Sequence, residues 1–155
     1  MGQIAHFVMK LEDIQPSQLF ISSAKLEQVM QDLDPVTRET LLPLPIKKLG
    51  QDVILTDGHT RALAAHLKGW EEIRVYWDED DLDWEAYAIC VQWCREAGIR
   101  TIADLADRIV PPEDYQVLWL QRCDRMHRDL AARRGARGKK TRFLCLHTSS
   151  HEEMP

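Results

Sequence analysis

The chain has 155 residues, of which 45% are apolar, so it suits one compact domain or a small domain with an appended subdomain and excludes disorder of the whole chain. No apolar run approaches the roughly 20 residues that span a bilayer, and the N-terminus lacks the charged start and apolar stretch of a secretory signal. We therefore expect a cytoplasmic protein with no membrane partner, whose four cysteines are reduced rather than disulfide-bonded.

The formal net charge of −5 is unevenly distributed along the chain. Residues 128–142 hold seven basic residues and one acid, a charge of +6, while residues 143–155 carry −2, which leaves −9 for residues 1–127. An acidic body disfavours a phosphate backbone, whereas a basic segment attracts one. A nucleic-acid partner is therefore expected to contact residues 128–142, and a solubilising tail is the alternative.

The first third of the chain predicts a strand, a loop and a helix. Residues 5–13 alternate weakly between apolar and polar and indicate a strand, which the loop at residues 15–17 follows. Residues 25–33 place apolar side chains at spacings of three and four, which indicates a helix. Pro35 and the Pro43-Leu44-Pro45 stretch end it.

The middle of the chain predicts a hairpin and a crossover. Residues 45–49 and 52–56 flank Gly50-Gln51, a connection short enough for a hairpin with glycine at positive φ. Residues 60–68 then predict a helix that ends at Gly69, and residues 72–77 return as a strand. Because one helix separates this strand from the strand before it, we expect the two strands to lie parallel through a right-handed crossover.

The last third is predicted to be helical. An acidic stretch at residues 78–83 reads as a solvated linker in which Asp83 caps the following helix, with a magnesium site as the alternative. Gly98 and Pro111 mark boundaries between helices. The helices are expected at residues 84–97, 101–110 and about 113–127.

These elements predict an α+β fold. We expect a small mixed sheet with helices over residues 1–80, a helical subdomain over residues 81–127, and a flexible basic tail over residues 128–155.

Residues 57–61, Asp-Gly-His-Thr-Arg, are the strongest candidate for a binding site. Gly58 allows close backbone approach, the following helix offers free N–H groups and a positive dipole end, and Arg61 can donate to two phosphate oxygens. Thr60 could cap the helix or touch phosphate, Asp57 could hold a divalent cation or accept a proton, and His59 could bind phosphate or shuttle a proton. The alternative is a capped turn with surface residues and no ligand.

The sequence around this segment resembles the ParB/sulfiredoxin superfamily. The resemblance lies in Val-Ile-Leu-Thr-Asp-Gly-His-Thr-Arg-Ala at residues 53–62, in Ala64-Ala65 and in Ile73-Arg74-Val75, preceded by the proline-led strand at residues 45–48. It covers about half of the chain. It implies a ParB/sulfiredoxin-like small mixed sheet and a phosphate or nucleotide bound by the loop residues Gly58, His59, Thr60 and Arg61.

The branches of the superfamily differ at this loop. Sulfiredoxins need a cysteine where this chain has His59, so their chemistry is excluded. Partition proteins share Gly58 and Arg61 and bind a cytidine nucleotide while clamping DNA, but their second nucleotide motif has no evident match here. Free serine kinases, which use ADP or ATP, have an Asp-Gly-His-x-Arg loop similar to this one. The resemblance makes Asp57 a base or metal contact, has Gly58, His59, Thr60 and Arg61 handle phosphate, and offers Glu12 as the counterpart of the N-terminal glutamate that these kinases use.

The expected function is nucleotide binding by a ParB-like domain that couples ADP, ATP or CTP, with Mg²⁺ possible, to DNA or a protein partner. The alternative is an enzyme of the free-serine-kinase type, a phosphotransferase or nucleotide hydrolase. As an enzyme it would depend on the catalytic set Asp57, His59 and Glu12.

Two further patterns have structural alternatives. Cys90 and Cys94 lie four apart on one expected helix, and Cys123 and His127 lie four apart on another, so they could together bind zinc or simply pack in the core. Residues 98–105 resemble the turn and second helix of a helix-turn-helix unit, with an ordinary helical bundle as the favoured reading.

Overall fold

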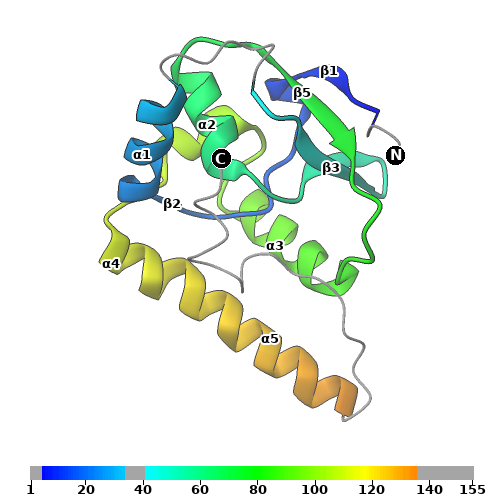
Figure 1. Cartoon of the computed structure of the whole chain (residues 1–155). Helices are drawn as coiled ribbons and strands as arrows, with labels where there is room; N and C mark the ends of the chain where they lie inside the picture. The colour runs from blue at the N-terminus through cyan, green and yellow to red at the C-terminus, as the bar shows by residue number, and fades with distance from the viewer. Residues whose placement is uncertain (1–4, 34–40, 136–155) are drawn as a thin grey trace.

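A computed structural model describes residues 5–33 and 41–135, and these form an α+β fold, as predicted (Figure 1). The elements in chain order are β1 (Phe7–Lys10), a 3-10 turn (Leu11–Asp13), β2 (Ile21–Ser22), α1 (Ser23–Leu33), β3 (Leu44–Leu49), β4 (Asp52–Leu55), α2 (His59–Leu67), β5 (Glu72–Trp77), α3 (Trp84–Glu96), a second 3-10 segment (Ile102–Asp107), β6 (Ile109–Val110), α4 (Pro112–Tyr115), a π-helical segment (Gln116–Leu120) and α5 (Gln121–Arg134).

The main sheet has the strand order β1-β5-β3-β4. β3 and β4 form the predicted antiparallel hairpin, and Gly50 has a φ of 64°, which the two-residue turn requires. On the outer edge of β4, the Gln15 N–H donates to the Val53 carbonyl at 2.8 Å and the Leu55 N–H donates to the Gln15 carbonyl at 3.0 Å. The N-terminal segment therefore begins beside β5 as β1 and ends beside β4, so the sheet is curled.

The predicted parallel arrangement of the strands on either side of α2 is wrong. β3 lies between β4 and β5, antiparallel to β4 and parallel to β5, so β4 and β5 run in opposite directions. The two-residue turn places β4 directly beside β3, which leaves only the other edge of β3 for β5. In this register Leu55 and Trp77 both pair with Ile46, so the carboxyl ends of β4 and β5 meet at one place on β3.

The predicted helix after the hairpin is confirmed within one residue as α2. Its buried side is rich in small side chains, and it packs against α1, which lies next to it in Figure 1. The C′ residue Gly69 has a φ of 89°, the left-handed conformation expected there. α2 is thereby held at both ends by glycines, because Gly58 precedes its first residue.

The helix predicted at residues 101–110 is wrong. Thr101 and Asp104 form a capping box, but the segment continues only as a 3-10 turn and then as β6. The reason is β2, because Ile21 donates its N–H to the Arg108 carbonyl at 3.0 Å and pairs in parallel with Ile109. The helix-turn-helix pattern therefore lacks its second α-helix.

The helices predicted at residues 84–97 and 113–127 are present, but the last one extends beyond the expected end. α3 begins after Asp83, whose Oδ1 accepts the Ala86 N–H at 3.2 Å as predicted for a cap. α4, the π-helical segment and α5 form one continuous rod that ends at Arg134 (Figure 1). The predicted tail therefore starts as helix at residues 128–134, while residues 136–155 lie outside the described residues.

The hydrophobic core of the described residues runs across the boundary expected at residue 80. One cluster contains Leu55 from β4 together with Cys90 and Trp119 from the helical part. A buried hydrogen bond also crosses the boundary, from the Gln15 side-chain amide to the Ile99 carbonyl at 2.9 Å. The sheet and the helices therefore share buried contacts.

Trp119 provides a test of this shared core. Its side chain is 1% exposed and meets Trp93 edge-on, with ring centroids 6.2 Å apart. We expect Trp119→Ala to lower the free energy of unfolding by about 3–5 kcal/mol, measured by urea denaturation. Val117→Ala is the control, because Val117 lies in the same segment but is 53% exposed, and it should change stability by only about 0.5 kcal/mol. Equal effects of the two substitutions would contradict this packing.

Candidate functional site

The candidate loop leaves the sheet where the ends of β4 and β5 meet. Thr56 donates its N–H to the Pro45 carbonyl at 3.2 Å, and Asp78 donates its N–H to the Ile46 carbonyl at 2.8 Å. The two ends are joined directly, because the Thr56 hydroxyl donates to Asp78 Oδ2 at 3.1 Å. The Tyr87 hydroxyl, from α3, donates to the Thr56 carbonyl at 3.1 Å. Asp57 therefore follows Thr56, a residue that hydrogen bonds connect to β3, to Asp78 after the end of β5, and to α3.

Gly58 is required at its position for two independent reasons. Its φ of 82° and ψ of 25° are left-handed, which favours glycine. A Cβ at this position would lie 2.8 Å from Leu44 Cδ2 and 3.0 Å from Arg61 Nη2. The guanidinium of Arg61 therefore lies close to the Gly58 backbone. The Gly58 N–H donates to Asp57 Oδ1 at 2.7 Å.

The first turn of α2 presents backbone donors. Ala62 is the first residue whose N–H makes an intrahelical bond, to the Gly58 carbonyl at 2.9 Å. The amides of His59, Thr60 and Arg61 precede it and have no intrahelical acceptor. Gly58 has no side chain with which to cap them. The positive end of the helix dipole and the Arg61 guanidinium therefore lie close together.

Arg61 is partly buried, and its neighbours are Asp57 and Tyr76. Burial lowers the pKa of Arg61, while the nearby Asp57 and Tyr76 act in the opposite direction, and the group remains a cation at neutral pH. Within the described residues, no hydrogen bond or ion pair joins the guanidinium to another side chain. Sequence reasoning missed Tyr76, although its place in β5 between the buried Val75 and the exposed Trp77 gave a weak signal.

His59 lies on the inner side of the loop. Its side chain is 4% exposed, and Nε2 accepts the Ser17 N–H at 2.9 Å. Burial lowers the pKa of His59 to about 3, so the imidazole is neutral and Nε2 is already occupied as an acceptor. In this arrangement His59 fastens the loop to the N-terminal segment. The proton shuttling predicted as one role of His59 would require Nε2 to release the Ser17 N–H.

Ser17 and His59 do not form a nucleophile and base. The Ser17 Oγ lies 3.5 Å from His59 Nε2, but it donates to the Leu55 carbonyl at 2.8 Å and is buried. A nucleophilic hydroxyl would have to donate its proton to the imidazole. Sequence reasoning missed Ser17 as a partner of the loop, because no local pattern connects residues 42 positions apart.

Glu12 belongs to a turn beside the beginning of β5, whereas the candidate loop follows the end of β4. It is exposed in the 3-10 turn after β1, where Lys10 pairs with Glu72 at the beginning of β5. Asp57, by contrast, follows the end of β4. No hydrogen bond or ion pair between described residues connects Glu12 to Asp57. The catalytic role of Glu12 therefore stays a prediction.

The cysteine pattern gives no metal centre in the part of the chain that the structure describes. Cys90, Cys94 and Cys123 are buried, and Cys90 is hydrogen-bonded to Cys123. No group of three His, Cys, Asp or Glu side chains among the described residues could hold a metal ion. Burial raises the pKa of Cys94 to about 12 and raises the pKa of Cys90 well above its usual value, so these thiols are protonated at neutral pH, as packing residues are. The zinc hypothesis, which included His127, therefore gains no support.

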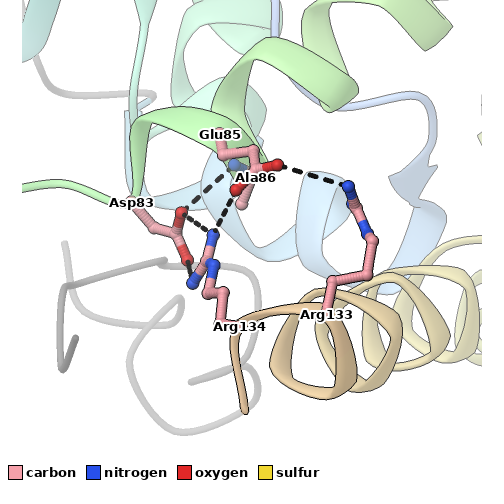
Figure 2. A network of polar contacts seen from close by, with 5 residues as sticks. All are labelled: Asp83, Glu85, Ala86, Arg133 and Arg134. Atoms are coloured by element: carbon pink, nitrogen blue, oxygen red, sulfur yellow. Dashed lines mark hydrogen bonds and ion pairs between the residues drawn. The ribbon is translucent and has the colours of Figure 1, made fainter. Parts of the chain in front are cut away.

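The basic residues of the predicted tail that lie in α5 are already paired with acids. Arg128 pairs with Asp124 at 2.5 Å within the helix. Arg133 and Arg134 contact acidic residues at the start of α3, as Figure 2 shows. These contacts leave residues 136–142, outside the described residues, as the remaining basic part of the predicted nucleic-acid contact.

No helix among the described residues is long and apolar enough to cross a membrane.

Comparisons with known proteins identify no family. No family model matches the chain, and no curated protein matches it. Among solved structures, the chain is similar to protein Atu1540 from Agrobacterium tumefaciens, with a TM-score of 0.42 and 15% identity. The similarity covers 47% of this chain and 38% of the Atu1540 chain, and a likeness this weak indicates neither a fold family nor a function.

The crowding around Gly58 is testable with a second glycine as the reference. Gly58 and Gly69 both have positive φ, but a Cβ at Gly69 would meet no atom within 4 Å. An alanine at either position costs about 1–2 kcal/mol for the backbone conformation alone. Gly58→Ala must also displace Leu44 or Arg61, which adds about 1–3 kcal/mol. Urea denaturation should therefore show Gly58→Ala to be the more damaging change, and equal losses would contradict the close approach of Arg61.

Proposed function

We propose that the chain binds the phosphate groups of a nucleotide at the N-terminus of α2, with Gly58, Thr60 and Arg61 as the contacting residues. The observation that carries this proposal is the Arg61 guanidinium, which packs against the backbone of a left-handed Gly58 without a hydrogen-bonding partner among the described residues. The amides of the first turn of α2, which have no intrahelical acceptor, lie next to it. A phosphate could accept from both, since backbone amides at a helix start and a guanidinium are common anion donors.

The carboxylate of Asp57 determines which kind of phosphate ligand fits. Asp57 and Arg61 together carry no net charge, so a bare anion would gain little from the field of the pair. A nucleotide with Mg²⁺ would bring a cation for Asp57 and phosphate oxygens for Arg61. Mg²⁺ is commonly bound by one or two carboxylates plus substrate phosphates. We therefore expect a di- or triphosphate, such as ADP, ATP or CTP, bound with Mg²⁺.

In this proposal His59 supports the loop. Its neutral Nε2 accepts the Ser17 N–H, which keeps the start of α2 against the N-terminal segment. The proposed activity is that of a ParB-like binding module that couples nucleotide binding to DNA or a protein partner, and the resemblance of residues 53–62 supports it.

A phosphotransferase of the free-serine-kinase type is the second candidate, and Asp57 favours it. Asp57 is partly buried beside Arg61, and only its Oδ1 is used by the Gly58 N–H. The other oxygen could accept a proton from a substrate hydroxyl while Arg61 holds the transferred phosphate. Among the described residues, Glu12, the other predicted catalytic carboxylate, forms no hydrogen bond or ion pair with this loop, so we place the binding module first.

Nucleotide titration of wild type and Arg61→Ala tests the binding site. Purified protein would be titrated calorimetrically with ADP, ATP, CTP and GTP, with and without Mg²⁺. Loss of a charge-assisted hydrogen bond costs about 1.5–3 kcal/mol, so Arg61→Ala should weaken binding by about 10- to 100-fold. Arg125→Ala, an exposed arginine on α5, removes the same charge and should leave the affinity unchanged. The absence of saturable binding by wild type, or equal affinity in Arg61→Ala, would overturn the proposal.

Asp57→Asn distinguishes the two candidates. The asparagine oxygen can still accept the Gly58 N–H, but the side chain can no longer take a proton from a hydroxyl. If the chain is a phosphotransferase, turnover of ADP or ATP with a small hydroxyl compound should fall by at least about 100-fold in the variant, since general-base catalysis is worth that much. If wild type binds nucleotide but shows no turnover above a protein-free control, the kinase candidate fails and the binding module remains.

A further inference from the structure

A cluster of ion pairs joins the end of α5 to the beginning of α3 (Figure 2). Arg134 donates from Nη1 to Asp83 Oδ2 at 3.2 Å and from Nη2 to Asp83 Oδ1 at 2.9 Å, and also reaches Glu85 Oε1 at 3.1 Å. Arg133 pairs with the other Glu85 oxygen, Oε2, at 3.5 Å. The side chains of Arg134 and Asp83 are 26% and 9% exposed, so water screens this two-bond pair less than an ordinary surface pair.

Asp83 has a second structural role, because it is also the N-cap of α3. The same Oδ1 that accepts from Arg134 also accepts the Ala86 N–H at 3.2 Å, and the Asp83 carbonyl accepts the Tyr87 N–H at 3.0 Å. Burial alone would raise the pKa of Asp83, but the hydrogen bonds from Arg134 and Ala86 lower it overall. The carboxylate is therefore ionised at neutral pH and holds the first turn of α3 to the end of α5.

Tyr87 connects this first turn to the candidate loop. Its side chain is 2% exposed, and its hydroxyl donates to the Thr56 carbonyl at 3.1 Å. Thr56 is the residue immediately before Asp57, and its own hydroxyl donates to Asp78. Direct contacts thus run from Arg134 through Asp83 and Tyr87 to the base of the loop.

We propose that Tyr87 is a positioning residue through which the Asp83–Arg134 ion pair at the end of α5 controls the conformation of residues 57–61. Release of Arg134 from Asp83 frees the first turn of α3, the Tyr87 hydroxyl loses its fixed position, and the Thr56 carbonyl loses one of the contacts that hold the loop. The effect on affinity rests on the proposed nucleotide binding, whereas the effect on loop conformation does not.

The experiment compares ion pairs on one helix. Arg134→Gln breaks the pair with α3. Arg128→Gln is the matched control, since among the described residues Arg128 pairs only with Asp124, within α5, and both side chains are more than half exposed. Asp83→Asn removes the attraction for Arg134 but keeps an N-cap acceptor for α3. Tyr87→Phe removes only the hydroxyl. Hydrogen–deuterium exchange of the amides at residues 57–61 is measured in the full chain without nucleotide, and the free energy of unfolding is measured alongside.

Coupling through Tyr87 predicts a specific pattern. Arg134→Gln and Asp83→Asn should each speed exchange at residues 57–61 by about 5-fold or more and weaken nucleotide binding by a similar factor, while Arg128→Gln should change neither. In the Tyr87→Phe background, Arg134→Gln should have little further effect, because the route is already broken.

The coupling would be overturned if Arg134→Gln and Arg128→Gln changed exchange at residues 57–61 equally, or if the effects of Arg134→Gln and Tyr87→Phe on that exchange were fully additive. It would also be overturned if exchange rose uniformly over the chain in proportion to the loss of global stability. If wild type binds no nucleotide, the proposed function fails while the exchange pattern still decides the coupling. If wild type binds nucleotide and the exchange pattern is absent, only the coupling fails.

Discussion

The hydrogen bond between Thr56 and Asp78 holds together the two chain segments on which the candidate site depends. β4 and β5 approach β3 from opposite directions, and their carboxyl ends stop at the same place, beside Pro45 and Ile46. A buried carboxylate is costly unless it is hydrogen-bonded, and Asp78 accepts from the Thr56 hydroxyl and from the Asp80 N–H. The loop of residues 57–61 therefore begins at a point that is fixed on both sides, which is the rigid support that a precise binding loop needs.

This fixed starting point explains the conformation of the residues that follow. Within the three residues between β4 and α2 the chain must change from a strand to a helix packed on α1, and the left-handed Gly58 makes that change possible. His59 then points inward to Ser17, and Arg61 lies back across Gly58. The two side chains thus have different roles. The neutral, buried imidazole of His59 holds the loop in place, while the Arg61 guanidinium lies near Asp57 and Tyr76.

Local patterns predicted the local parts of this arrangement well. The hairpin around Gly50, the helix ending at Gly69 and the cap at Asp83 all follow from residues that are neighbours in the sequence. What failed depends on distant partners. The direction of β5 relative to β4 depends on their common neighbour β3, to which β4 is antiparallel and β5 is parallel. Residues 109–110 form a strand because they pair with β2. The contacts of His59 with Ser17 and of Arg134 with Asp83 likewise join residues that no hydrophobic period connects.

The negative charge of residues 1–127 means that a phosphate-binding site in this chain would have to attract its ligand through groups in direct contact with it. Residues 1–127 carry a formal charge of −9, so the long-range field repels a nucleotide, and attraction must come from groups within a few ångströms. Arg61 and the amides of α2 supply such groups, whereas the arginines at the end of α5 are occupied by Asp124, Asp83 and Glu85. A ligand that arrived with its own cation would avoid most of the repulsion and would also satisfy Asp57. For this reason a metal-bound nucleotide fits the charge distribution better than a free phosphate, and the proposed binding should depend more on Mg²⁺ than on long-range attraction.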